Sequence, residues 1–211
     1  VTSINYDIIF KIGMEFFYSF GLEGVSKIRK LKKNAKLFLD LKLHDIPNTV
    51  EKSIYPLVTK VKPYMLTLHV AGGKKMLQKS VAAATKASIE YNIKKPLLLG
   101  VTVLTSLNNK DFKEMGHSVL IEDYVKNYSK IAINANLEGI VCSPLEVELI
   151  KKLYGDNLKL VTPGIRLKKN PNDDQSRFLT PKEAFKMGSD FIVMGRPLIN
   201  STNPNEVIEK I

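Results

Sequence analysis

Three charged residues interrupt an apolar stretch that otherwise predicts a buried β-strand. The stretch reads FLDLKLHDIPNTV and contains Asp40, Lys42 and Asp45. Because side chains in a strand alternate between the two faces of a sheet, we expect Asp40 and Lys42 to point to the same side. Asp45 follows in a loop, and Lys11 interrupts the preceding apolar run, IIFKI, in the same fashion.

Lys11 is expected to lie beside Asp40 and Lys42, because successive strands of a parallel sheet are neighbours. With Asp45, these residues would form an alternating array of ammoniums and carboxylates at the carboxyl ends of the strands. Charges in such a partly desolvated place are costly unless each is paired. A single Asp–Lys pair is equally well explained as a structural ion pair. Four such groups at the carboxyl ends of parallel strands, where the active sites of β/α barrels lie, indicate an active site.

A second group of residues has the composition of a phosphate-binding site. The sequence MGRPL follows the last apolar run, and Gly195 would let backbone N–H groups approach a phosphate at the start of the next helix. Arg196 offers a guanidinium that can bind two phosphate oxygens. The polar segment 164–179 is longer than most loops, which is typical of functional lids. The alternative interpretation of that segment is a solvated surface loop.

Short apolar runs alternate with amphipathic segments along the whole chain. The runs are apolar on both faces, as strands covered by helices tend to be, and they are residues 8–12, 37–41, 65–70, 97–103, 139–142, 158–162 and 190–194. The segments with helical periodicity are residues 15–33, 48–62, 74–92, 121–136, 144–154 and 181–187.

This alternation predicts one α/β domain over residues 1–211 with a parallel sheet. A closed (β/α)₈ TIM barrel needs one more strand than the sequence shows, so we expect a barrel whose first strand is missing from this chain. That barrel would have an open seam between its last strand and the strand that carries Lys11. An open doubly wound sheet is the alternative, but no GxGxxG fingerprint follows the first strand.

The composition indicates a soluble protein of a reducing compartment. The 211-residue chain has a formal net charge of +11, carried mostly by dispersed lysines. We interpret them as solvated helix surface and expect neither nucleic acid nor a membrane as a partner. No signal peptide or apolar span is visible, which predicts a cytoplasmic protein. The lone cysteine, Cys142, is expected to be a small core residue, and the three histidines lack metal-ligand spacing.

The stretch FLDLKLHDIPNTV resembles the signature of the orotidine 5′-phosphate decarboxylase family, in which D-x-K-x-x-D is followed by I-P-N-T. Further stretches look like the family's blocks in the family's order, namely FKIGMEFF, LHVAGG, LGVTVLTS, VTPGIR, DDQSR and VMGRPL. The likeness covers essentially the whole chain. Related barrels that act on sugar phosphates with a magnesium ion share D-x-K-x-x-D, but IPNT, TPGIR and GRP favour the decarboxylase.

The resemblance implies that CO₂ is removed from orotidine 5′-phosphate to give uridine 5′-phosphate, the last step of de novo UMP synthesis, without a metal or organic cofactor. Lys42 would donate a proton to pyrimidine C6, and Asp40 would sit near the substrate carboxylate. Lys11 would hold Asp40 and the ribose hydroxyls in place. Asp45 and Thr49 would reach into the active site of a partner subunit, which implies a homodimer with shared sites.

The resemblance also implies the residues that bind the rest of the substrate. Thr105 would read the pyrimidine edge. Gln175 would bridge the phosphate and the base. Arg166 would line the phosphate side, together with Gly195 and Arg196.

The chain departs from the family at its N-terminus, where a strand of the type A-L-D, with a ribose-binding aspartate, is absent. Three hypotheses follow, in order of preference. The first is an active orotidine 5′-phosphate decarboxylase. The second is a magnesium-dependent sugar-phosphate decarboxylase or aldolase of the same suprafamily, and the third is an inactive truncated barrel that only binds nucleotide.

Overall fold

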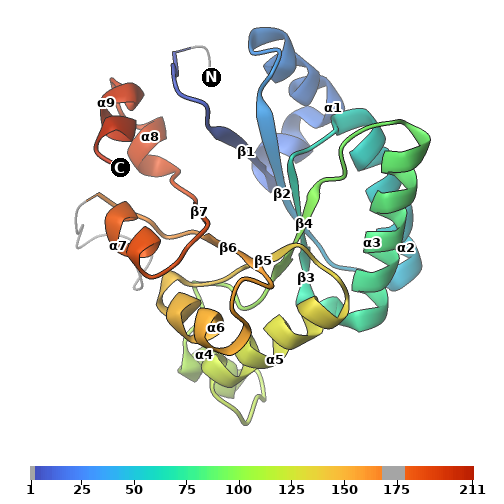
Figure 1. The fold of residues 1–211 in the computed structure, drawn as a ribbon, viewed down its shortest axis with the longest axis vertical. Helices are drawn as coiled ribbons and strands as arrows, with labels where there is room; N and C mark the ends of the chain where they lie inside the picture. Colours follow the sequence, from blue (N-terminus) through green and yellow to red (C-terminus); the bar gives the residue numbers. More distant parts are fainter. Residues whose placement is uncertain (1–2, 168–178) are drawn as a thin grey trace. The chain divides into compact units, whose positions relative to one another are not determined.

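A computed structural model of the chain describes residues 3–167 and 179–211 (Figure 1). Two compact units are present, one formed by Val1–Gly100 with Asn134–Leu137 and the other by Val101–Ile133 with Glu138–Ile211. Both alternate parallel strands with helices, and the strands follow one another in sequence order.

The first unit holds the strands that carry the charged stretch. Its strands are β1 (Ile9–Gly13), β2 (Lys36–Leu43), β3 (Met65–His69) and β4 (Leu97–Val101), the last residue of which begins the second unit. Its helical segments are α1 (Met14–Leu31), α2 (Pro47–Pro56), the π-helix η1 (Leu57–Val61), the 3₁₀ turn η2 (Val70–Gly72) and α3 (Gly73–Glu90). β1 pairs with β2, and β2 pairs with β3.

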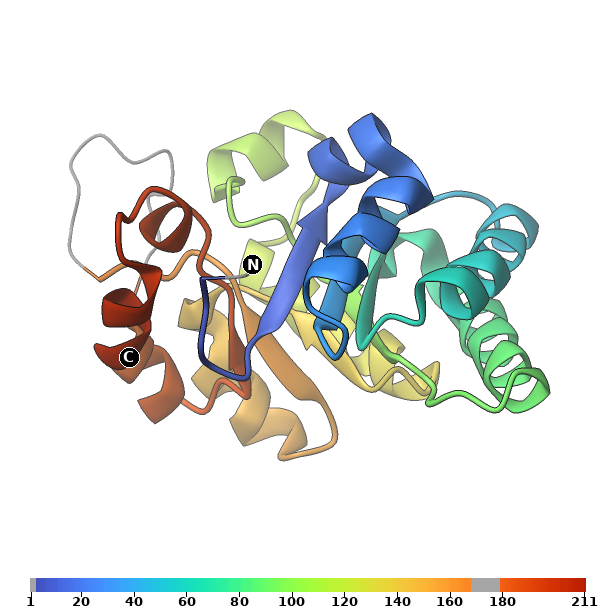
Figure 2. The ribbon, with the colours of Figure 1, turned by 90° about the horizontal axis from the view of Figure 1, so that it is seen from above.

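Leucines at alternating positions make β2 and β3 the centre of this unit's core. Leu37, Leu39, Leu66 and Leu68 are fully buried, and each such side chain contributes roughly 1.5–3 kcal/mol relative to exposure. Helices α2 and α3 pack closely against each other (Figures 1 and 2).

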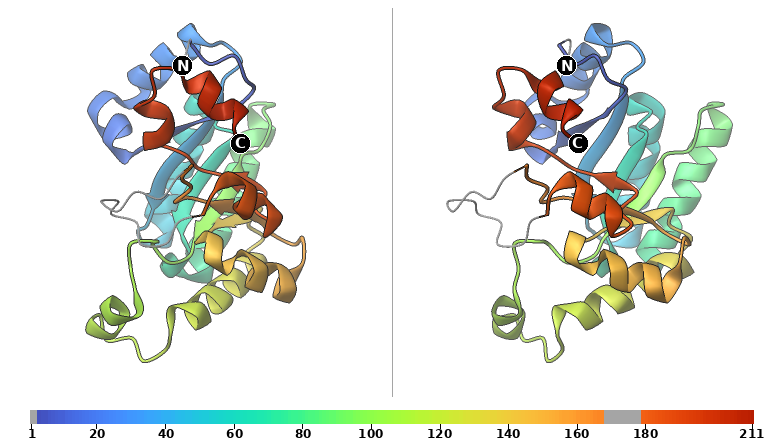
Figure 3. Two further views of the ribbon diagram at one scale, coloured as in Figure 1. Left: turned by 90° about the vertical axis from the view of Figure 1, so that its left-hand side faces the viewer. Right: turned by 60° about the vertical axis from the view of Figure 1, so that its left-hand side comes forward.

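The second unit is built from shorter elements. Its strands are β5 (Gly139–Val141), β6 (Lys159–Thr162) and β7 (Phe191–Ile192). Its helical segments are α4 (Asn109–Glu114), α5 (Ile121–Asn134, whose last residue belongs to the first unit), the 3₁₀ turn η3 (Pro144–Glu146), α6 (Val147–Tyr154), α7 (Pro181–Lys186), α8 (Arg196–Ile199) and α9 (Pro204–Glu209). β6 pairs with both β5 and β7 in parallel, and α8 packs against α9 (Figure 3).

The seven predicted strands and six predicted helical segments are all present, with ends shifted by up to a few residues. Residues 144–154 form a 3₁₀ turn followed by α6, and residues 47–61 form α2 followed by a π-helix. α4 and α9 are short and were not predicted, while α8 is the helix expected after Gly195. The prediction of a single domain and the prediction of an open seam both depend on how the two units are arranged. Both therefore stay predictions.

Cys142 is fully buried, as predicted for a core residue, and burial raises the pKa of its thiol well above the usual value. Because the thiolate is the reactive form, the folded protein is expected not to react with Ellman's reagent near pH 8. One equivalent of thiol should react once guanidinium unfolds the chain. Rapid reaction of the folded protein would contradict this packing.

Within the described part of the chain, no helix combines the length and apolar character that a membrane crossing requires.

Candidate active site

The charged residues of β1 and β2 meet in one cluster. The ammonium of Lys11 lies 3.2 Å from Asp40 Oδ2. The ammonium of Lys42 lies 2.9 Å from each oxygen of the same carboxylate. Asp40 itself is only 8% exposed, whereas the lysine side chains are 35% (Lys11) and 26% (Lys42) exposed. The carboxylate is therefore the buried centre of the cluster, and both ammoniums remain accessible to a ligand.

Opposing effects set the ionisation of Asp40. Burial alone would raise the pKa of its carboxyl group, because the charged form loses hydration. The charge of Lys11, followed by the hydrogen bond and charge of Lys42, outweighs that effect and holds the pKa of Asp40 below its usual value. The site thus keeps a carboxylate anion at neutral pH in a place that water barely reaches.

Lys42 has an unusual backbone. Its φ is +50°, in the left-handed region that non-glycine residues rarely adopt. The pairing of β2 with β3 shifts between Leu39 and Leu43, so the ladder is irregular where the charged residues lie. The prediction that residues 40–42 form regular strand is therefore wrong. The side chains of Asp40 and Lys42 do meet, but they do so across an irregular part of the ladder and not through regular strand alternation.

Thr67 is a polar member of the cluster that sequence reasoning missed. Its side chain is fully buried in β3, and its hydroxyl donates to Asp40 Oδ1 at 3.0 Å. The same hydroxyl accepts the backbone N–H of Lys42 at 2.9 Å. The available signal was one hydroxyl in the apolar run MLTLH, which ordinary β-propensity also explains.

Two histidines lie next to the cluster. The rings of His44 and His69 are 5.3 Å apart, centroid to centroid. Burial, then the charges of His44 and Lys42, lower the pKa of His69 despite the opposing effect of Asp40. His69 is therefore neutral at pH 7 and adds no charge to the site.

Asp45 and Thr49 lie apart from the three clustered charges. Both are exposed, and Asp45 Oδ1 accepts the N–H of Ile46 at 2.6 Å. No ion pair joins Asp45 to Lys11 or Lys42 among the described residues. A hollow of about 560 Å³ beside Asp45 is lined in part by His44 and Ile46. Within one chain the structure assembles three of the four charges that the sequence argument grouped.

The remaining predicted residues belong to the second unit. Thr105 is half-buried in the loop after β4, and Arg166 is buried, with its guanidinium donating to the carbonyl of Ile165 at 3.0 Å. Gly195 precedes α8, and a Cβ built on it would meet no atom within 4 Å. Arg196, the first residue of α8, is exposed. Gln175 lies outside the described residues.

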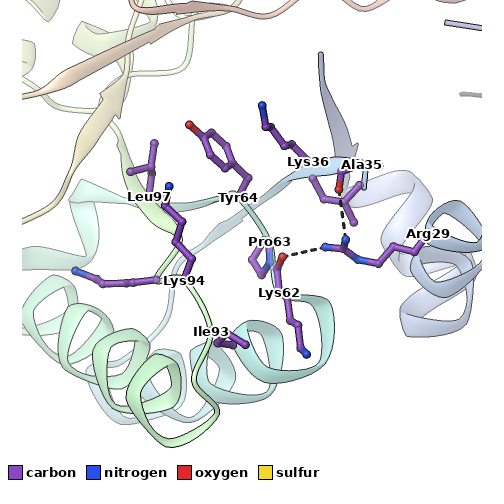
Figure 4. A pocket seen from close by; sticks show the side chains of 11 residues that line it. Arg29, Ala35, Lys36, Lys62, Pro63, Tyr64, Ile93, Lys94 and Leu97 are labelled. Carbon is purple, nitrogen blue, oxygen red and sulfur yellow. Dashed lines mark hydrogen bonds between the residues drawn. The ribbon is translucent and has the colours of Figure 1, made fainter. Parts of the chain in front are cut away.

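Another cationic region of the first unit has a structural explanation. A hollow of about 310 Å³ before the amino ends of β2, β3 and β4 is lined by Arg29, Lys36, Lys62 and Lys94, among others (Figure 4). The Arg29 guanidinium donates to the carbonyls of Val61 and Lys62 at 2.9 Å and of Ala35 at 3.3 Å. Arg29 therefore joins the segments before β2 and β3. The carboxylate held between two ammoniums lies at the opposite ends of the strands.

Among residues 3–167 and 179–211, no group of three or more His, Cys, Asp or Glu side chains is arranged to hold a metal ion.

Comparison with known proteins identifies the family of the chain. The family model described as "Orotidine 5′-phosphate decarboxylase / HUMPS family" matches residues 2–211. Orotidine 5′-phosphate decarboxylase of Legionella pneumophila (strain Corby) is 41% identical over 201 residues, which cover 95% of this chain and 85% of that protein. Orotidine 5′-phosphate decarboxylase of Dictyoglomus thermophilum is 41% identical over 203 residues, which cover 96% of this chain and 82% of that protein.

A solved structure shows the same fold. The crystal structure of orotidine 5′-phosphate decarboxylase from Lactobacillus acidophilus matches with a TM-score of 0.81 at 34% identity, over 94% of this chain and 83% of that one. The predicted fold class, a TIM barrel with seven β/α units in this chain, is confirmed by this match and by the strand order. The chain belongs to the orotidine 5′-phosphate decarboxylase / HUMPS family.

Proposed function

We propose that this chain decarboxylates orotidine 5′-phosphate to uridine 5′-phosphate, the last step of de novo UMP synthesis, in the cytoplasm and without a metal or organic cofactor. One observation carries the proposal, namely the carboxylate of Asp40 held between the ammoniums of Lys11 and Lys42. The names of the relatives at 41% identity support the choice of substrate.

The chemical difficulty lies at pyrimidine C6. When the bond to the carboxylate breaks, CO₂ leaves and the electron pair stays on C6, where no electron sink receives it. In our proposal the ammonium of Lys42 stabilises this carbanion and then donates its proton to C6. The remaining amine takes a proton from solvent before the next turnover. Asp40 supports this step because its carboxylate, within 2.9 Å, fixes the position of the ammonium.

Asp40 has a second proposed effect, on the substrate itself. A carboxylate ionised at neutral pH would repel the negative charge of the bound orotate group. That repulsion disappears as neutral CO₂ forms, so it favours the reaction over the bound ground state. Lys11, which pairs with the other side of Asp40, is proposed to bind the ribose hydroxyls and prevent the carboxylate from turning away.

Residues of the second unit are proposed to bind the phosphate and the base. Arg166 and Arg196 would neutralise the phosphate, and backbone N–H groups near Gly195 would donate to it. The open space around Gly195 supports close approach of a ligand. Thr105 is proposed to read the pyrimidine edge, and Gln175 to bridge the base and the phosphate.

We further propose a homodimer with shared active sites. Asp45 and Thr49 are exposed, and the apolar side chain between them, Ile46, is 65% exposed. In the dimer, Asp45 would supply the fourth charge of the array in the partner subunit's active site.

The competing function is magnesium-dependent chemistry on a sugar phosphate, which the joint family description leaves open. The test is the fall of orotidylate ultraviolet absorbance on adding the purified chain, with and without a chelator. We expect a steady fall that the chelator does not change. Activity that a chelator abolishes would support the magnesium-dependent relative instead.

Nucleotide binding without catalysis is the remaining possibility. It predicts no loss of absorbance together with a higher thermal midpoint when uridylate is added, because a ligand of the folded state stabilises that state. If folded protein shows no loss of absorbance and no shift of the thermal midpoint, both activity and binding are contradicted.

A further inference from the structure

We propose that Thr67 is a positioning residue of the active site, whose hydroxyl sets both the carboxylate of Asp40 and the backbone of Lys42. The inference rests on the proposed function, in which Lys42 is the proton donor, and it identifies the residue that holds Lys42 in place. Thr67 is the middle residue of β3 (Met65–His69, MLTLH), and nothing about its residue type marks it as functional.

The hydroxyl of Thr67 bonds to both Asp40 and Lys42. A threonine hydroxyl has a single hydrogen to donate, and here it goes to Asp40 Oδ1 at 3.0 Å. An oxygen lone pair accepts the N–H of Lys42 at 2.9 Å. The side chain is fully buried, so a hydroxyl at this position would be costly without those partners. One atom therefore links both members of the proposed catalytic pair.

The pairing of β2 with β3 is irregular beside Thr67. Leu39 pairs with Leu66, and Leu43 pairs with Leu68, so three residues of β2 stand opposite Thr67 alone. A regular ladder cannot supply a carbonyl partner for each amide in such a stretch. The side chain of Thr67 supplies the partner for the Lys42 amide instead.

The backbone of Lys42 carries a conformational cost. A lysine with φ of +50° has a less favourable backbone conformation than a lysine in a regular strand, and such conformations persist where surrounding contacts impose them. The bond from the Lys42 amide to Thr67 is such a contact. This backbone conformation directs the side chain back to Asp40, with its ammonium 2.9 Å from both carboxylate oxygens.

Removal of the hydroxyl should therefore misplace the proton donor without touching the substrate. A displacement of about 1 Å at a reacting group can cost on the order of 10²-fold in rate. Thr67→Val keeps the shape and branching of the side chain and deletes the hydroxyl, whereas Thr67→Ser keeps the hydroxyl. Thr85→Val is the matched control, because the Thr85 hydroxyl donates to the carbonyl of Val81 within α3, away from the cluster.

The experiment measures kcat and KM of the full chain for orotidylate in these variants, together with hydrogen exchange of the Lys42 amide. We expect Thr67→Val to lower kcat by about 10²-fold with KM changed less than about threefold, and to speed exchange of that amide. Thr67→Ser should recover kcat to within about fivefold of the parent, and Thr85→Val should match it. If the valine variant does not fold, Thr67→Ala compared with Thr67→Ser tests the same hydroxyl.

Two results would overturn the proposal. One is parental kcat in a folded Thr67→Val protein, and the other is an equal loss of kcat in the serine and valine variants. An inactive parent chain would refute the proposed function instead. Exchange at Lys42 would then still decide whether Thr67 positions this backbone, because equal protection in the parent and in Thr67→Val would contradict it.

Discussion

Replacement of Lys42 by alanine is expected to lower kcat/KM for orotidylate by about 10⁴-fold or more, with the protein still folded. Two contributions are lost together, namely proton donation, typically about 10²–10⁴-fold, and stabilisation of the developing charge, about 10²–10³-fold. The substitution removes the ammonium that now contacts both oxygens of Asp40. The measurement is the rate of absorbance loss, normalised to folded protein by circular dichroism. Lys86→Ala, at an exposed lysine of α3, is the control and should retain parental activity.

Lys42→Arg separates the two contributions. Arginine keeps a positive charge beside Asp40, but its guanidinium does not release a proton in proteins. If Lys42 acts as the proton donor, the arginine variant should remain almost as inactive as the alanine variant. Substantial activity with arginine would show that Lys42 acts through its charge alone and that the proton comes from another group.

The sequence predicted the parts of this fold that depend on periodic burial. β2 and β3 read as apolar runs because their side chains are buried on both faces, and α1, α3 and α5 are long enough to show helical periodicity. α4 and α9 have six residues each, too few for a periodic signal. The capping box of α4, in which Asn108 and Asp111 bond reciprocally, was readable as N-x-x-D but is common outside helices as well.

The candidate site was predictable only where neighbouring strands settle the contacts. Lys11 and Asp40 lie on adjacent parallel strands, so their pairing follows from the order of the strands. The left-handed backbone of Lys42 did not follow, because glycine or asparagine usually marks that conformation. Thr67 was indistinguishable from a residue chosen for β-propensity. Asp45 was grouped with the cluster by spacing alone, although its loop carries it to an exposed position.

Asp40→Asn is expected to lower kcat by at least about 10²-fold and to destabilise the folded chain near pH 7. Asparagine keeps the shape of the side chain but leaves the ammoniums of Lys11 and Lys42 without their common counter-ion. Loss of a fully buried ion pair costs about 3–5 kcal/mol, and we expect about 1–3 kcal/mol here because both lysine side chains are partly exposed. Urea unfolding of both proteins gives this difference in the free energy of unfolding.

The pH dependence of that difference identifies its cause. The pKa of Asp40 is lower in the folded chain than its usual value, so the ionised carboxylate stabilises the folded state above the unfolded pKa, near 4. This contribution disappears as the pH falls through the folded pKa. Other carboxyl groups with lowered pKa values, such as Asp190 and Glu183, titrate in both proteins and cancel in the comparison. The gap in unfolding free energy between the parent and Asp40→Asn should therefore be widest near pH 7 and narrow below about pH 4. A gap that stays constant down to about pH 3 would mean that asparagine disturbs packing, and that the charge of Asp40 does not stabilise this site.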